Sequence, residues 1–242
     1  MSIQTIVCEN YSEMSARCAE IFAEQIQKKP DSILGLATGS TPIGTYENLC
    51  KLYEDGKLDF SKVISFNLDE YYPISPENDQ SYRYFMNYHL FDHVNIDKAN
   101  TNVPNGLAED GAAEGARYEA LIASLGGIDL QILGIGQNGH IGFNEPGDEL
   151  YPTTHLTDLT PSTIKANSRF FASEDDVPKQ ALSMGMGSIL NARKIVIMAS
   201  GAAKHDAIMK MLSGVMTTKT PATFLACHAD VTLICDEAAY NG

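Results

Sequence analysis

The chain contains five short, largely apolar runs, most of them apolar at consecutive rather than alternate positions, and this pattern limits the folds open to the chain. The runs lie at residues 33–37, 63–68, 130–135, 195–199 and 231–235. Strands that are apolar on both faces are typical of a parallel sheet that helices cover on both sides. Helical periodicity separates the runs, at residues 12–28, 43–55, 81–91, 111–124, 178–190 and 203–213, with Ser12 and Ser81 as expected N-caps. This alternation predicts a Rossmann-like, three-layer α/β fold with a doubly wound, mostly parallel sheet.

We expect residues 1–242 to form a single domain. The chain contains no internal repeat, no low-complexity tract and no linker rich in Pro, Gly or Ser. A chain of 242 residues is also long enough to bury a large core without a disulfide or a metal. The polar stretch 153–178 shows little pattern of secondary structure. Long loops of that kind often cover active sites, so we expect a lid there.

Charge and cysteine content narrow the classes of partner. Thirty-one acidic residues against 17 basic ones leave a net charge of −14, which disfavours nucleic acids and acidic membrane surfaces. The five cysteines show no CxxC spacing and are typical of reduced, mostly buried thiols. No signal peptide and no apolar run of about 20 residues is visible. We therefore expect a cytoplasmic protein.

The first polar strand end reads Ala37-Thr-Gly-Ser-Thr-Pro42. A glycine and several hydroxyl groups just before a helix make a nest for an anion such as a phosphate. An ordinary capped turn between a strand and a helix has a similar composition, so both interpretations stay open on this stretch alone. The candidate ligand-binding residues are Thr38, Gly39, Ser40 and Thr41.

The second strand end carries two adjacent acids in the sequence Phe66-Asn-Leu-Asp-Glu-Tyr71. A carboxylate placed among aromatic residues at a strand end is desolvated, which raises its pKa toward the range of a general base at neutral pH. Two solvated acids in a turn are the alternative. Asp69 is the candidate base.

The third strand end is rich in glycine and contains His140 between Asn138 and Glu145. Its start matches GxGxxG, but Gly142 and Pro146 interrupt the helix that a dinucleotide site requires. Asp158 stands at roughly the distance of the required acid, but it does not follow an apolar strand. A histidine with a carboxylate close in sequence is instead typical of general acid–base catalysis at neutral pH. A structural histidine is the alternative.

Two basic residues complete the set of candidates. Arg169 lies in the polar stretch 153–178, and Lys204 lies at an expected helix start. A cation at a helix N-terminus is unfavourable unless an anion joins it. Solvated surface charges are the alternative for both.

Taken together, these motifs resemble the glucosamine-6-phosphate deaminase family, within the group that contains glucosamine/galactosamine-6-phosphate isomerases and 6-phosphogluconolactonases. The resemblance extends from Leu34 to Glu237. Where the lactonase branch usually reads Ser-Leu-Phe-Pro, this chain reads Phe143-Asn-Glu-Pro146, so the deaminase branch fits better. The motifs that carry the resemblance are Ala37-Thr-Gly-Ser-Thr-Pro42, Phe66-Asn-Leu-Asp-Glu-Tyr71, Gly139-His-Ile-Gly-Phe-Asn-Glu-Pro146, Asn167-Ser-Arg-Phe-Phe171 and Cys235-Asp-Glu237.

The resemblance implies a role for each candidate. Asp69 matches the base that moves a proton from C2 to C1 of an amino-sugar phosphate. His140, oriented by Glu145 and Asn138, matches the group that opens the sugar ring. The loop 38–41, with Arg169 and Lys204, matches the phosphate site. The implied reaction needs no metal or organic cofactor, and no motif for either is present.

Two features separate this chain from the allosteric hexamers of the family. Residues 151–160 contain no Lys or Arg, and the longer C-terminal tail of those members is missing. We therefore expect an unregulated enzyme, with a monomer favoured over a homo-oligomer. The competing hypotheses are a 6-phosphogluconolactonase-like hydrolase and a non-catalytic sugar-phosphate sensor. A sensor would need a DNA-binding helix-turn-helix, and none is visible before residue 33.

Overall fold

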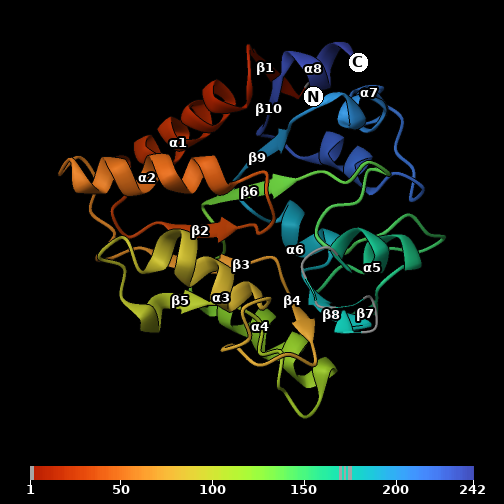
Figure 1. Cartoon of the computed structure of the whole chain (residues 1–242), viewed down its shortest axis with the longest axis horizontal. Coiled ribbons are helices and arrows are strands. Elements are labelled where there is room, and N and C mark those ends of the chain that lie inside the picture. The colour runs from red at the N-terminus through yellow and green to blue at the C-terminus, as the bar shows by residue number, and fades with distance from the viewer. Residues whose placement is uncertain (1–2, 169–170, 172, 174–175) are drawn as a thin grey trace.

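The structure, a computed structural model, describes residues 3–168, 171, 173 and 176–242. A seven-stranded sheet forms its centre, and every pair of neighbouring strands in this sheet runs parallel (Figure 1). The expected three-layer α/β fold is confirmed. In spatial order the strands are β1 (Gln4–Cys8), β10 (Val231–Asp236), β9 (Lys194–Ala199), β6 (Leu130–Gly134), β2 (Ile33–Leu36), β3 (Ile64–Asn67) and β5 (Thr101–Asn102).

The helices follow the predicted periodicity closely in most places. Helix α3 continues directly into a π-helical turn at Asn87–Phe91, so the predicted helix at 81–91 is present with one irregular turn. The N-cap of α1 is Asn10 and not Ser12, whereas Ser81 caps α3 as expected. The helices are α1 (Tyr11–Lys28), α2 (Ile43–Glu54), α3 (Tyr82–Met86), α4 (Gly111–Ser124), α5 (Pro161–Asn167), α6 (Met186–Leu190), α7 (His205–Leu212) and α8 (Glu237–Asn241).

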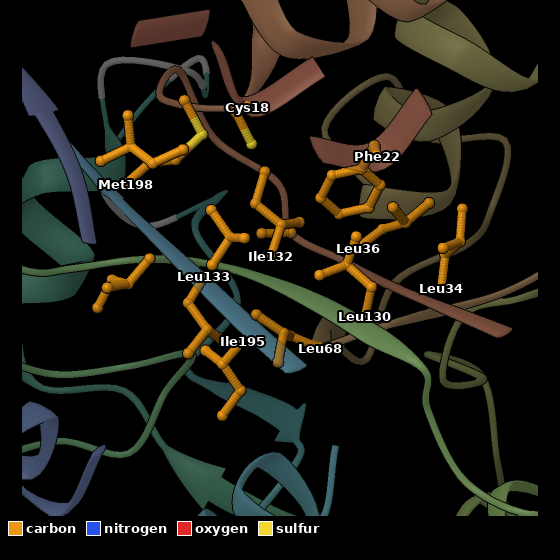
Figure 2. Close-up of a cluster of buried hydrophobic side chains, with 14 of the residues drawn as sticks. Cys18, Phe22, Leu34, Leu36, Leu68, Leu130, Ile132, Leu133, Ile195 and Met198 are labelled. Atoms are coloured by element: carbon orange, nitrogen blue, oxygen red, sulfur yellow. The ribbon is translucent and has the colours of Figure 1, made fainter. Parts of the chain in front are cut away.

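The core lies on both faces of the sheet, as the consecutive apolar positions predict. On one face, Leu34 and Leu36 lie close to Phe22 of α1 (Figure 2). The parallel register turns Phe66 of β3 toward the opposite face, where its ring packs edge-to-face on Tyr118 of α4 at 5.5 Å between centroids. Burial of these large side chains on both faces contributes roughly 2–3 kcal/mol each and holds the sheet between its helices.

The predicted helix at 178–190 is wrong. The chain forms strand β8 (Gln180–Ser183) and then the short helix α6. Strand β8 is the centre of a second, antiparallel sheet, between β4 (Asp69–Tyr72) and β7 (His155–Asp158). At Gly185, which precedes α6, an added Cβ would lie 2.4 Å from the carbonyl oxygen of Thr153. Strand pairing and this close approach of two backbones override the local helical periodicity.

The polar stretch 153–178 is more regular than expected, because it contains β7 and α5. Thr160 caps α5 by accepting a hydrogen bond from the backbone N–H of Thr163. The expected lid function of this stretch stays a prediction. Among the described residues, no helix is both long and apolar enough to cross a bilayer. All five cysteines are free and four are buried, which confirms the expected mostly buried thiols.

The order of the strands reverses between β2 and β6. From β2 the chain proceeds to β3 and β5 on one side, and from β6 it proceeds to β9 and β10 on the other. Ligands of doubly wound proteins bind in the crevice at such a switch point, beyond the carboxyl ends of the strands. The loops that follow β2 and β6 begin there.

Candidate active site

A cavity of about 840 Å³ opens at this switch point. It is lined by the loops after β2 and β6, the start of β4, helix α3 and part of α5. Arg169 lies outside the described residues, and Glu145 lies next to His140 but does not line the cavity. The candidate residues that do line the cavity are Thr38, Gly39, Ser40, Thr41, Asp69, Asn138, His140 and Lys204.

The loop after β2 has the features of an anion site. The N-cap residue of α2, Pro42, forms no side-chain capping bond, and within the first turn the Tyr11 hydroxyl accepts only from Gly44 N. The other backbone donors at the positive end of this helix face the loop. The φ angle of Gly39 is +90°, a conformation that favours glycine. Tyr11 holds the end of the loop, because its hydroxyl donates to Ser40 O and Thr41 O and accepts from Gly44 N.

Lys204 reaches the cavity from the turn that follows β9, the strand next to β6. It ends a short 3₁₀ turn (Ala202–Lys204) and precedes α7, and its Nζ donates to the carbonyl oxygen of Ile135 at 2.7 Å. Burial lowers its pKa, and no carboxylate of the described residues forms an ion pair with it. A half-buried ammonium group beside a helix N-terminus is well placed to bind an anion.

Asp236, from the motif Cys235-Asp-Glu237, supports the turn that carries Lys204. Its carboxylate accepts hydrogen bonds from the hydroxyl of Ser200 and the backbone N–H of Gly201, and it also caps α8 through Ala239 N. These bonds tie the end of β9 to the end of β10. The motif therefore stabilises the position of Lys204 without lining the cavity.

Asp69 and Glu70 are buried, which excludes the interpretation of two solvated acids in a turn. Asp69 is 6% exposed and Glu70 is 2% exposed. Asp69 starts β4, with one residue between it and the end of β3, and its carboxylate has no hydrogen-bond partner among the described side chains. Burial, assisted by the charge of Glu70, raises the pKa of Asp69 to about 8. Such a basic carboxylate suits proton abstraction near neutral pH.

Glu70 has a different environment on the other side of β4. Its two oxygens accept hydrogen bonds from the backbone N–H groups of Tyr71, Tyr82 and Arg83, at 2.8–2.9 Å. Burial raises the pKa of Glu70 to about 7, although these three donors favour its ionised form. Glu70 therefore joins β4 to the start of α3, whose residues line the cavity.

His140, Asn138 and Glu145 lie together in the loop after β6. Asn138 Nδ2 donates to Glu145 Oε2 at 2.8 Å, and Asn138 Oδ1 accepts from the backbone N–H of His140. His140 Nδ1 lies 3.4 Å from the same Oε2, without the alignment of a full hydrogen bond. Although burial pushes the pKa of Glu145 upward, His140, Thr163 and Asn138 lower it to about 2. An ionised Glu145 can stabilise a protonated imidazole.

Two glycines of this loop lie where a side chain would collide with or crowd a candidate residue. A Cβ at this position would lie 2.4 Å from His140 Nδ1, so the ring occupies the space that a side chain would fill. Gly142 is also close to the cavity, with a φ of +58°, and a Cβ there would lie 3.4 Å from Asp69 Oδ2. Because Gly136 and Gly142 have no side chains, His140 and Asp69 can lie on the same wall of the cavity.

Sequence reasoning did not identify an aromatic cluster and one threonine on the cavity wall. Tyr71, Tyr82, Phe143 and Phe171 pack together with centroid separations of 4.8–6.2 Å. Thr163 lies on α5 and donates to Glu145 Oε1. Phe143 lies close in sequence to His140, and Tyr71 lies close to Asp69. This closeness could have identified both aromatic residues as part of the cavity wall. Thr163 has no such signal, because its contact depends on tertiary structure.

The described residues include no group of three or more His, Cys, Asp or Glu side chains that could hold a metal ion. Their fold and cavity define an α/β protein that binds its ligand at the switch point of a parallel sheet. A family model described as glucosamine-6-phosphate isomerases/6-phosphogluconolactonase matches residues 9–234, and the chain belongs to this family.

Close relatives come from one branch of the family. A glucosamine-6-phosphate deaminase of Clostridium perfringens is 57% identical over 237 residues, with 98% of each chain covered. The protein of that name from Halothermothrix orenii is 56% identical over the same length and coverage. A solved structure described as a monomeric glucosamine-6-phosphate deaminase is 44% identical, with a TM-score of 0.96 over 99% of each chain. A 6-phosphogluconolactonase from Trypanosoma cruzi, at 20% identity and a TM-score of 0.80, shares the fold.

Proposed function

We propose that the chain converts glucosamine 6-phosphate and water into fructose 6-phosphate and ammonia. The observation that carries this proposal is the meeting, in one cavity, of a buried carboxylate with a raised pKa and a histidine beside an ionised glutamate. One group suits proton transfer at carbon, and the other suits proton transfer between oxygens. Relatives at 56–57% identity bear the name of this activity.

The substrate's phosphate binds at the loop 38–41 and Lys204. The backbone donors at the start of α2, the hydroxyl groups of the loop and the ammonium group of Lys204 supply complementary charge. Arg169 joins this site in the proposal through the resemblance of its motif to the family. The sugar ring then extends toward Asp69 and His140.

The reaction proceeds through two proton-transfer stages in this proposal. His140 takes the proton from O1 and delivers it to O5, which opens the ring, while Glu145 stabilises the transient imidazolium. Asp69 removes the proton from C2 of the open aldehyde to form an enolamine, and the same carboxyl returns a proton at C1. The resulting imine at C2 adds water and releases ammonia, which leaves the ketone of fructose 6-phosphate.

Two alternatives are less well supported. The 6-phosphogluconolactonases among the similar structures are 17–21% identical to this chain, a level that supports a common fold alone. A sensor without catalytic activity would need neither a buried Asp69 on its cavity wall nor the pairing of His140 with Glu145. Reduced thiols and the match to a structure described as monomeric support a monomeric, cytoplasmic enzyme of N-acetylglucosamine degradation as the fuller proposal.

Incubation of the purified chain with glucosamine 6-phosphate tests the proposal directly. We expect ammonia and fructose 6-phosphate to form in equal amounts, with hyperbolic rate curves in the absence of any activator. Hydrolysis of 6-phosphogluconolactone, measured in parallel, is expected to be negligible. Failure to release ammonia from glucosamine 6-phosphate would refute the assignment. Rate curves that become hyperbolic only when N-acetylglucosamine 6-phosphate is present would refute the expectation that the enzyme is unregulated.

Replacement of Lys204 by methionine is expected to raise KM for glucosamine 6-phosphate by about 10- to 100-fold, because one charge-assisted hydrogen bond to the phosphate is lost. The value of kcat is expected to change less, since this contact is made equally in the ground state and the transition state. Steady-state kinetics measure both constants. The matched control is Lys210→Met, which removes an exposed lysine of α7. A fall in kcat at unchanged KM would contradict the assigned phosphate contact.

A further inference from the structure

We propose that Thr163 is a positioning residue that orients the Glu145 carboxylate toward His140, and so joins helix α5 to the proton-transfer pair. This inference rests on the proposed function. Thr163 is 9% exposed, and its Oγ1 donates to Glu145 Oε1 at 2.6 Å. The other oxygen of that carboxylate, Oε2, faces Asn138 and His140. The two oxygens therefore have separate partners.

The direction of each hydrogen bond follows from the chemistry of the groups. Thr160 Oγ1 donates to Thr163 Oγ1 at 3.0 Å, so the single hydroxyl proton of Thr163 is left for the next acceptor. An ionised carboxylate can only accept, and Glu145 Oε1 takes this proton. A short chain of hydroxyl groups thus runs from the start of α5 to Glu145. Hydrogen bonds in such a chain strengthen one another.

The contact matters because a glutamate carboxylate that is held at one oxygen can still turn about its last bond more than one held at both oxygens. Asn138 bonds only Oε2, and His140 Nδ1 is 3.4 Å from that same atom. The hydroxyl of Thr163 is the second restraint, on Oε1. With both restraints, Oε2 stays in reach of Nδ1 when the imidazole becomes protonated during ring opening. Loss of the Thr163 hydroxyl lets the carboxylate turn away, which slows the proton transfer and leaves the phosphate site untouched.

Two variants of Thr163 separate the effect of its hydroxyl group from the effect of its methyl group. Thr163→Val keeps the shape and removes the donor, and we expect it to lower kcat for glucosamine 6-phosphate about tenfold while KM changes less than about twofold. Thr163→Ser keeps the donor and is expected to retain most of the activity. The matched control is Thr157→Val in β7, a threonine of the same segment that does not line the cavity.

A double-mutant cycle with Glu145→Gln identifies the partner through which Thr163 acts. If Thr163 works by orienting Glu145, Thr163→Val is expected to cause no further loss in the Glu145→Gln background. Equal losses in both backgrounds, or a rise in KM alone, would overturn the proposal and assign to α5 a structural or substrate-binding role. If Thr163→Val does not fold, as judged by circular dichroism, Thr163→Ala takes its place in the cycle.

A second measurement does not depend on turnover. Carboxyl NMR titration of Glu145 is expected to show a higher pKa in Thr163→Val than in the wild type or Thr163→Ser, because the hydroxyl stabilises the ionised form. His140 is the titratable group that faces Glu145 among the described residues, and all three proteins retain it. An unchanged pKa would overturn the positioning contact even in an active enzyme. An inactive wild type with the expected pKa change would overturn only the proposed function.

Discussion

Asp69→Asn is expected to lower kcat for glucosamine 6-phosphate by about 10²- to 10⁴-fold, the usual contribution of a positioned general base. Asparagine has nearly the same shape as aspartate but cannot accept the proton from C2. The phosphate loop and Lys204 are unchanged, so the affinity for sugar phosphates is expected to persist. Coupled assays of fructose 6-phosphate measure the rate. Calorimetry with glucitol 6-phosphate, which has no carbonyl group to enolise, measures binding to both proteins.

The control for this variant is Asp31→Asn, which makes the same chemical change at an exposed position of the chain. It is expected to retain the wild-type kcat and KM. Substantial turnover by Asp69→Asn would show that another group removes the C2 proton. Loss of glucitol 6-phosphate binding would show that Asp69 acts in binding, because the carboxylate would then stabilise the ground state.

The parallel sheet was predictable because its strands are buried on both faces. The runs at 33–37 and 195–199 are apolar at nearly every position and coincide with β2 and β9 within one residue at each end. Strand β1 was not predicted, because it lies at the edge of the sheet and most of its side chains are half-buried or exposed. Its pairing with β10 depends on a partner more than 200 residues away.

The second sheet was not predictable from local pattern. Strand β4 consists of Asp69–Tyr72, two acids and two tyrosines, which as a local sequence is equally typical of a polar turn. Its strand conformation comes from antiparallel pairing with β8, and that segment itself has helical periodicity. The same tertiary pairing buries Asp69. Sequence identified this residue and His140 from their neighbours, but not the contact between Thr163 and Glu145, because no spacing rule relates helix α5 to the loop that carries Glu145.

The stability of the fold is expected to depend on pH through the buried Asp69 carboxylate. Its pKa is about 8 in the folded protein, whereas its ordinary value is 3.8. A group whose pKa is raised by folding contributes stability below its unfolded pKa and loses that contribution as the pH rises through its folded pKa. Between about pH 4 and pH 8, ionisation of Asp69 therefore favours the unfolded chain, by an amount on the order of several kcal/mol.

Asp69→Asn is for this reason expected to be more stable than the wild type at pH 8 and of similar stability near pH 4. The neutral amide avoids the cost of a buried, unpaired charge, and Glu70 then becomes a single anion that retains its three backbone N–H donors. Urea unfolding of both proteins at pH 4.5 and pH 8 measures the difference. A difference in unfolding free energy that is the same at both pH values would contradict the raised pKa. An increase with pH would show that the same burial that makes Asp69 basic enough for catalysis also destabilises the fold, as expected where an active site trades stability for function.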